Sequence, residues 1–263
     1  MRIVFISLLL LLLGETSYEQ TTPSAPPFYY QRDFKILLEQ SKDKASDLYY
    51  QKLLIRFLDN DSALTRAQTL TLLIGFTENQ QYKPYEDMAT EKEIFDMNDS
   101  GDYEGALDES KTYLQKHPLS LRILKERSYS YHQLRKADSA KYFMDLVDKV
   151  MGAMIYSGKG KTPETAIFSL GLIDGEHFIE NAGMTIANKT TTSPKSKVLM
   201  YIVDALSDEG THTNYYFVIQ HARDKMNEED IGEEPVTKLK KAKKGKKDNK
   251  PTKAVKDSIP GGK

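Results

Sequence analysis

Residues 101–107, GDYEGAL, and residues 131–140, YHQLRKADSA, form the stretch of sequence that decides the fold. Ala106 and Ala140 lie 34 positions apart, which is the period of a tetratricopeptide repeat. Alanine suits these places because a small residue lets the two helices of a hairpin cross closely. The spacing therefore predicts two helical hairpins of this type.

The two predicted hairpins are not equally regular, and together they span about 90–151. Pro118 follows the first hairpin, where a proline ends a helix without wasting a backbone donor. The second hairpin has Arg135 where the first has a turn glycine, and no terminal proline follows it. Two repeats are fewer than a free-standing solenoid needs. We therefore predict one complete and one degenerate repeat within a larger helical domain at 28–152.

Helix starts are also visible before the repeat. Thr65 with Gln68, and Thr90 with Glu93, have the spacing of capping boxes, in which two side chains satisfy free backbone donors. Apolar residues at helical spacing over 28–40 and 50–58 predict two further helices upstream.

The sequence changes character from Tyr156 onward, where Gly, Thr and Ser become frequent. Runs rich in β-branched and aromatic residues predict strands. These runs lie at 166–170, 198–203 and 215–219, with a short helix expected at 174–182. We expect a small α/β part over 153–226, with an antiparallel sheet packed on the helical domain. The predicted fold class is α+β.

The first residues resemble a signal peptide. Arg2 precedes a largely apolar run at 3–13, and small residues follow it. A membrane anchor is the alternative interpretation, but a helix of that length reaches only ~16 Å of the roughly 30 Å that a membrane requires. We therefore expect a signal peptide at 1–17, a proline-containing linker at 18–27, and an exported protein of the periplasm or cell envelope. No transmembrane segment is expected in the mature form.

The end of the chain is expected to be a disordered tail over 227–263, first acidic and then rich in lysine. Residues 238–263 hold 11 lysines and two aspartates, whereas the whole chain has a net charge of −1. The body is therefore acidic and the tail basic. The segment Lys238–Lys256 is a candidate contact for an anionic polymer or lipid. It has no aromatic residue for base stacking, so specific nucleic-acid binding is not expected.

Few residues are candidates for a catalytic or metal-binding site. The chain has no cysteine, which excludes disulfides and thiolate metal sites. Glu176, His177 and Glu180 are the candidate metal ligands, and His177 and Glu180 would share a helix face. One histidine with carboxylates is not typical of zinc, and a solvated helix face is the simpler interpretation. We assign no catalytic, cofactor-binding or metal residue, and we expect no cofactor.

Residues 158–162, GKGKT, suggest a phosphate-binding loop. Such a loop has a first glycine five places before the Gly-Lys-Thr triplet, so that backbone amides can surround the phosphates. Ile155 occupies that place, and a predicted helix rather than a strand precedes it. A glycine turn joining the two halves of the protein is the better interpretation.

Several short motifs resemble one family. They are LT at 64–65, GF at 75–76, QYKPY at 81–85, YHQL at 131–134 and SGKGKTPETA at 157–166. In these the chain resembles domain of unknown function 4919, which is found mainly in exported Bacteroidota proteins. The resemblance covers about 28–217 and departs from the family at Leu73-Ile74 and at Lys159. It implies export and a helical-repeat core, and it implies no reaction.

Three functional hypotheses remain open. The first is a non-enzymatic envelope protein that binds another protein in the groove of the helical hairpins. The second is a metal-dependent hydrolase or other enzyme with a site near Glu176, His177 and Glu180. The third is tethering to an anionic surface through the lysine tail.

Overall fold

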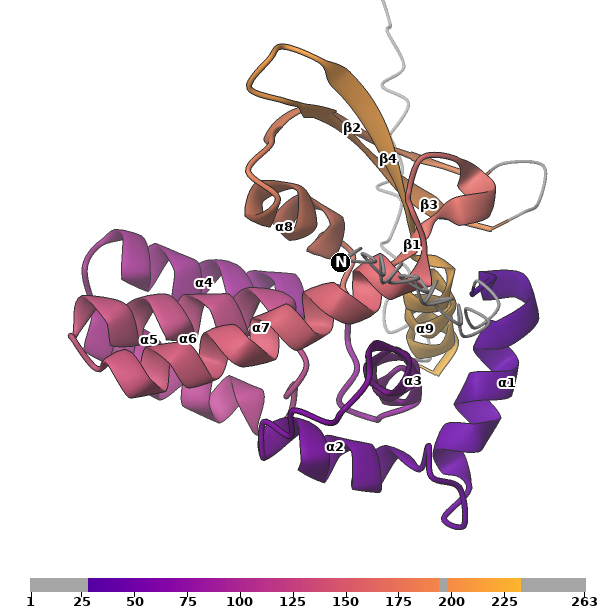
Figure 1. The fold of residues 1–263 in the computed structure, drawn as a ribbon, viewed down its shortest axis with the longest axis horizontal. Coiled ribbons are helices and arrows are strands. Elements are labelled where there is room, and N and C mark those ends of the chain that lie inside the picture. Colours follow the sequence, from indigo (N-terminus) through magenta and orange to yellow (C-terminus); the bar gives the residue numbers. More distant parts are fainter. Residues whose placement is uncertain (1–27, 194–197, 233–263) are drawn as a thin grey trace, which may run out of the picture.

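The computed structural model describes residues 28–193 and 198–232, with side chains to residue 228. The first half contains α1 (Tyr30–Lys42), α2 (Tyr50–Leu58), α3 (Arg66–Phe76), α4 (Asp87–Asp99), α5 (Tyr103–Leu114), α6 (Leu121–Gln133) and α7 (Ala137–Ser157). The second half contains η1 (Pro163–Thr165), β1 (Ile167–Phe168), α8 (Asp174–Asn181), β2 (Thr185–Thr192), β3 (Met200–Leu206), β4 (His212–Val218) and α9 (Gln220–Gly232). The predicted α+β class is confirmed, with helices first and the sheet after them (Figure 1).

The two predicted hairpins are α4–α5 and α6–α7. Ala106 is fully buried in a small cluster with Ile94 of α4 and Ile123 of α6. At the second site the hydroxyl of Ser128 on α6 donates a 2.8 Å hydrogen bond to the carbonyl of Ala140 on α7. Both alanines therefore lie where helices cross closely, as their spacing predicts.

The second hairpin keeps the backbone conformation of the first turn although it has arginine in place of glycine. Gly101 and Arg135, at equivalent places in the two turns, have φ angles of 85° and 58°. Both are left-handed, a conformation that glycine adopts freely and that costs other residues about 1–2 kcal/mol. The second repeat is degenerate in sequence, but it keeps the same turn.

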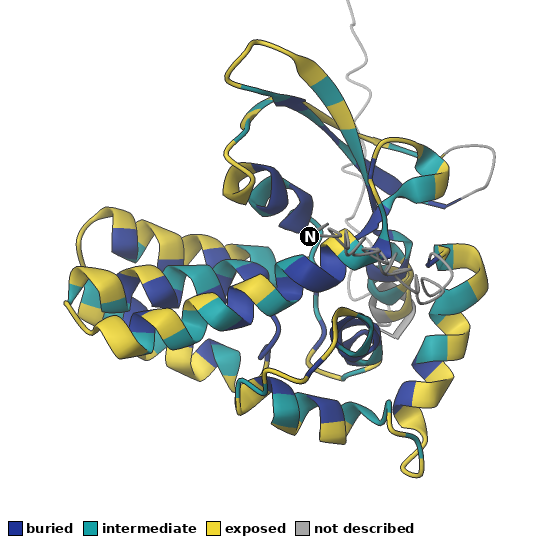
Figure 2. Cartoon of the chain, in the orientation of Figure 1, coloured by how far each residue is buried: buried dark blue, intermediate teal, exposed yellow. Residues whose placement is uncertain are grey.

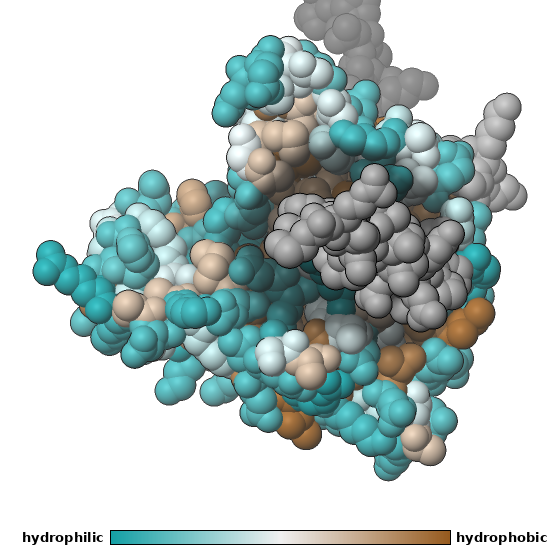
Figure 3. Space-filling view, viewed as in Figure 1, coloured by the Kyte–Doolittle hydropathy of each residue, from teal (hydrophilic) through white to brown (hydrophobic). Residues whose placement is uncertain are grey.

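Helix α3 is the centre of the larger core. It is buried on all sides, including Leu70, Leu72, Leu73 and Ile74, and it packs against α1, α2 and α7. Figure 2 shows it as a mostly dark blue helix between α1 and α7. A helix that is apolar all round is stable only when neighbours cover every face. In contrast to this buried helix, the surface of the molecule seen from the same side is mainly hydrophilic (Figure 3).

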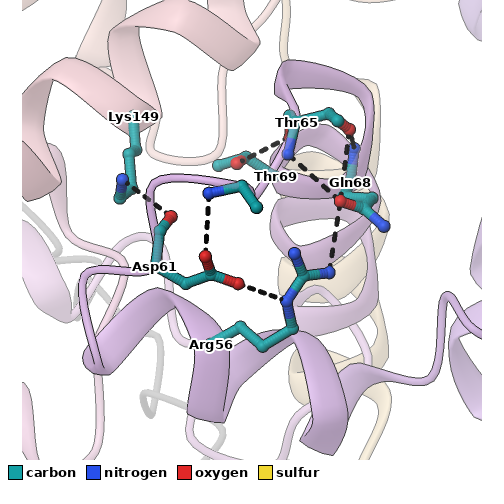
Figure 4. Close-up of polar contacts among 7 residues, drawn as sticks. Arg56, Asp61, Thr65, Gln68, Thr69 and Lys149 are labelled. Atoms are coloured by element: carbon teal, nitrogen blue, oxygen red, sulfur yellow. Dashed lines mark hydrogen bonds and ion pairs between the residues drawn. The ribbon is translucent and has the colours of Figure 1, made fainter.

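The start of α3 is fixed by the predicted capping box. The backbone N–H of Gln68 donates to the Thr65 hydroxyl at 3.2 Å, and the backbone N–H of Thr65 donates to the side-chain oxygen of Gln68 at 3.1 Å. Arg56 of α2 donates a 3.3 Å hydrogen bond to the Gln68 side chain at this start. It also forms a 2.7 Å ion pair with Asp61 in the turn, whose carbonyl accepts from Lys149 of α7 (Figure 4). These contacts hold the α2–α3 turn against α7.

The second predicted capping box, at Thr90 and Glu93, is wrong. Helix α4 begins at Asp87, so Thr90 lies inside it and cannot cap its start. The turn at residues 84–86 already leads the chain into the helix, upstream of the motif.

The sheet has the strand order β1-β4-β3-β2 (Figure 1). Strands β2, β3 and β4 are antiparallel, as expected, whereas β1 pairs with β4 in parallel over two residues. The predicted runs correspond to β1, β3 and β4. Strand β2 was not predicted, because its sequence TIANKTTT is polar and it lies largely exposed at the edge of the sheet.

The boundaries differ in places from those predicted. Helix α7 continues to Ser157, beyond the expected domain boundary at 152/153, and α9 runs to Gly232, beyond the expected start of the tail at 227. The predicted signal peptide (1–17), linker (18–27) and lysine segment (238–256) lie outside the described residues. Among the helices that are described, none has both the length and the apolar character needed to cross a membrane.

The matched turns give a test of the repeat. Arg135→Gly should raise the free energy of unfolding by about 0.5–1 kcal/mol, because relief of backbone strain exceeds the added entropy of the unfolded chain. Gly101→Ala should lower it by about 1 kcal/mol. No heavy atom lies within 4 Å of a Cβ added at Gly101, so this cost is purely conformational. Urea denaturation measures both changes, and a change of the opposite sign at either position would contradict the equivalence of the turns.

Candidate functional site

A groove of about 390 Å³ lies between the first helices of the two hairpins and α8. Helix α4 contributes Phe95, Asn98 and Asp99; α6 contributes Arg122, Lys125, Glu126 and Tyr129; and α8 with its preceding residue contributes Ile173, Glu176, His177 and Glu180. The hairpins thus form one wall of the groove and α8 the other. In Figure 3 the surface is indented between the hairpins and the part of the molecule that carries the sheet.

Two cations on α6, Arg122 and Lys125, form no ion pair within the described residues. Their side chains form no hydrogen bond there either, but the charge of each helps to lower the pKa of Glu180. The Arg122 guanidinium lies 5.1 Å from the centre of the Phe95 ring. Its Nε is buried and lacks a hydrogen-bond partner among the described residues. Stacking on an aromatic ring leaves the other donors of a guanidinium available.

Three of the four acidic side chains that line the groove contact a hydrogen-bond donor or a cation. Glu126 accepts a 2.9 Å hydrogen bond from the side-chain amide of Asn98. Glu176 forms a 2.7 Å ion pair with Lys189. Glu180 lies 3.4 Å from His177 Nδ1, and this contact lowers the pKa of Glu180.

Two aromatic side chains are exposed at the groove. Phe95 of α4 is 41% exposed and Tyr129 of α6 is 44% exposed. Exposed large apolar residues matter when they gather at a concave surface, because a partner can then cover them. Aromatic side chains also contribute strongly to binding energy at interfaces.

The three candidate metal ligands do not converge. Glu176 turns toward the sheet, where it accepts hydrogen bonds from Lys189 of β2 and Tyr201 of β3. His177 and Glu180 face each other at the groove wall, as their spacing predicted. Within the described residues, no group of three or more His, Asp or Glu side chains has an arrangement that could hold a metal ion.

A second feature lies beside the groove and was missed in the sequence. A small cavity of about 30 Å³ is lined by Asp87 and Glu91 of α4, by Tyr113 and His117 at the end of α5, and by Asp174 at the start of α8. A water molecule needs about 10–15 Å³ of such space, so the cavity has room for roughly two. Ile173 lines both the cavity and the groove.

Hydrogen bonds connect the acids of the cavity to its walls. Ser120 donates to Glu91 at 2.6 Å, and the Tyr113 hydroxyl lies 3.4 Å from the same Glu91 oxygen. The backbone N–H of Gly171 donates to Asp174 at 2.6 Å. His117 Nδ1 is buried and lies 3.4 Å from an Asp87 oxygen, without a hydrogen bond of good geometry.

Burial sets the protonation of this cavity. Loss of solvent, together with the charge of Glu91, raises the pKa of Asp87 to about 7. Burial and Asp174 raise the pKa of Glu91 to about 6. Burial raises the pKa of Asp174 as well, and it lowers the pKa of His117 to about 4. Near neutral pH Asp87 is therefore protonated in a large share of the molecules, and His117 is uncharged.

One signal in the sequence pointed to this cavity. Asp87 and Glu91 are like charges four positions apart on one helix face, a pairing that destabilises an exposed helix. Protonation of one of the two carboxylates would remove this repulsion. Asp174 comes from a distant part of the chain, so the full group is not visible before folding.

Residues 158–162 do not have the geometry of a phosphate-binding loop. They follow helix α7, and the Gly160 N–H donates to the Thr165 carbonyl at 2.7 Å. The Gly160 carbonyl accepts from Tyr216 of β4 at 2.8 Å. The segment is a turn that ties the end of α7 to the sheet.

The cavity predicts a pH dependence of stability. Below pH 3.8, the usual pKa of Asp87, the folded and unfolded chains both keep the proton. Between there and about pH 7 only the folded chain keeps it, so Asp87 lowers stability as the pH rises. Asp87→Asn should therefore change the free energy of unfolding little at pH 4 and raise it by about 1–3 kcal/mol at pH 8. Urea denaturation at both pH values measures the difference.

The matched control is Asp108→Asn on the exposed face of α5. It should show no growth of the effect with pH. An equal effect of Asp87→Asn at pH 4 and pH 8 would show that Asp87 keeps an ordinary pKa in the folded protein.

Comparisons with known proteins place the chain in a family. Neither the curated proteins nor the solved structures contain a match to it. The model of the family described as Domain of unknown function (DUF4919) matches residues 35–228. This match covers α2 to β4 completely and most of α1 and α9, and it confirms the resemblance seen in the short motifs. The chain belongs to the DUF4919 family.

Proposed function

We propose that this protein is a non-enzymatic binding protein of the cell envelope that holds a segment of another protein in the groove between α4, α6 and α8. The observation that carries the proposal is the gathering of two exposed aromatic side chains, Phe95 and Tyr129, along one concave surface. The envelope location is part of the proposal and rests on the signal-peptide pattern at 1–17.

The shape of the surface supports binding of a chain segment. Stacked helical repeats form concave faces, and such faces are commonly used for binding. The groove, at about 390 Å³, has the size of a site that accepts a few side chains. Helix α8 narrows this surface to a groove with two walls, so a bound segment would be covered on both sides.

The small size of the acid cavity argues against the alternative that the protein is an enzyme with its active site there. Asp87, Glu91 and Asp174 are the described acids whose environment suits proton transfer. Their cavity of about 30 Å³ accepts water but no larger substrate. The groove beside it is open and large enough, but most of its acids already have partners. Binding is therefore the better proposal.

Truncation of the two aromatic side chains tests the groove. The full chain should enrich a partner from envelope extracts, and Phe95→Ala with Tyr129→Ala should reduce the affinity for that purified partner at least 10-fold. The reason is that each aromatic anchor at an interface contributes about 1 kcal/mol or more. Isothermal titration calorimetry measures the affinity.

The matched control is Ile55→Ala with Met144→Ala. These side chains are 60% and 41% exposed and lie outside the groove. The control should bind the partner like the original protein. Equal affinities for the groove variant and the control, or no enriched partner at all, would refute binding in the groove.

A further inference from the structure

We propose that the acid cavity beside the groove is a proton-operated latch, which holds the start of α8 against α4 while its carboxyl groups carry protons and releases it when they ionise. The titrating groups are Asp87 and Glu91 of α4, and Asp174 at the start of α8 lies across the cavity from them. The latch goes beyond the binding role proposed above, because it sets the separation of the groove walls whether or not a partner is present.

The cavity joins parts of the chain that are far apart in the sequence. One side belongs to the first hairpin, and the other is the segment 170–174 that leads into α8. Helix α8 packs on β2, β3 and α6, and in Figure 1 it lies between the hairpins and the sheet. Ile173 lines both the cavity and the groove. A shift of this segment away from α4 would therefore also widen the groove.

No lysine or arginine forms an ion pair with the acids of the cavity. Among the described residues, the hydrogen bonds of Glu91 and Asp174 come from uncharged donors, the hydroxyl of Ser120 and the backbone N–H of Gly171. The one ionisable base within ion-pair distance of Asp87 in this part of the chain is His117. Carboxylates that ionise inside such an enclosed space repel one another with little screening by solvent.

The histidine of the cavity does not supply the missing positive charge. His117 lies 3.4 Å from an Asp87 oxygen, and its buried Nδ1 has no hydrogen-bond partner among the described residues. A histidine beside a carboxylate often gains a proton and compensates the charge. Here burial lowers the pKa of His117 to about 4. It is therefore uncharged when Asp87 and Glu91 ionise.

Titratable and charged groups face Asp87 and Glu91 from every element around the cavity. They are Tyr82 and Glu86 before α4, Tyr113 and His117 at the end of α5, Arg122 of α6, and Asp174 and His177 of α8. Burial raises the pKa of both tyrosines, so they stay neutral. Glu86 is paired with Lys83 at 3.0 Å. Arg122 remains as a permanent cation of this set, and its charge acts on Glu91 more weakly than that of Asp174.

The direction of the response to pH follows from burial. In the closed latch, burial and the charge of Glu91 raise the pKa of Asp87 to about 7, and burial and Asp174 raise the pKa of Glu91 to about 6. In an open latch both carboxyl groups reach water and regain their ordinary pKa values of 3.8 and 4.5. The closed state therefore binds more protons between those values and about pH 7. A rise in pH through this interval favours the open state.

The test measures the separation of α4 and α8 without a partner. The chain has no cysteine, so spin labels attach only to cysteines that are introduced. Glu93→Cys and Ala182→Cys place one label on the exposed side of α4 and one at the end of α8. From pH 5 to pH 8 the distance between the labels, measured by pulsed electron paramagnetic resonance, should increase by about 2 Å or more, the size of ordinary helix and loop rearrangements.

A matched pair of labels lies within the first hairpin. Glu93→Cys with Asp108→Cys reports the distance between α4 and α5, which the latch does not change. This distance should be the same at pH 5 and pH 8. An equal increase in both label pairs would show a general loosening of the fold and would overturn the latch.

A variant that cannot ionise at the cavity identifies the cause. Asp87→Asn with Glu91→Gln keeps the shape of both side chains and an oxygen that accepts from Ser120. In the α4–α8 labelled protein, this variant should keep its pH 5 distance at pH 8. The single variant Asp87→Asn should show a smaller increase than the original protein. A response that comes from other groups, such as His177, would persist in both variants.

The remaining outcomes decide against the latch. An α4–α8 distance that is equal at pH 5 and pH 8 in the original protein would overturn it, as would an undiminished increase in the double variant. Thermal unfolding of each labelled protein confirms that it is folded at both pH values. None of these measurements involves a partner, so a failure of the latch is distinguishable from a failure of binding in the groove.

Discussion

The close crossing of α6 and α7 is the contact on which the rest of the structure depends. Ser128 and Ala140 let the two backbones approach until a side-chain hydroxyl reaches the carbonyl of the opposite helix. Helix α7, which is 21 residues long, continues from this crossing into the main core, where it packs against α3 and then meets β1. One rigid helix therefore fixes the hairpins relative to the sheet. The groove lies between α4 and α6 of these hairpins and α8, which packs on β2 and β3.

The hairpins are also held together by buried polar groups that lack ionic partners. Arg127 is buried, and its guanidinium donates to the Leu107 carbonyl and to the Ser110 and Tyr131 hydroxyls while lying near the Phe143 ring. No carboxylate among the described residues forms an ion pair with it. A buried charge of this kind is tolerated only when its donors are satisfied. Such bonds give little net stability, but they specify one arrangement of the helices.

Neighbouring side chains of helix α8 face three different surroundings. Asp174 faces the enclosed cavity, Glu176 faces β2 and β3, and His177 faces the groove. Successive positions of a helix point about 100° apart, so three acids and bases in one short motif meet three environments. This is why the ligand spacing of Glu176, His177 and Glu180 did not produce a convergent site. The functional surface is instead shared between α8 and helices of the hairpins.

By itself the sequence determined the hairpins, the capped start of α3 and three of the four strands. Those features follow from spacing and periodicity, which are local properties of the chain. Membership in the family was indicated by short motifs that the chain shares with it. It missed β2, because an exposed edge strand carries no apolar alternation. Only the tertiary structure decided that Asp87 and Glu91 meet Asp174 in a cavity, and that Arg122 lies unpaired opposite His177. The physical reason is that burial and pairing of charge depend on residues far apart in the chain, whose meeting is fixed by packing rather than by local pattern.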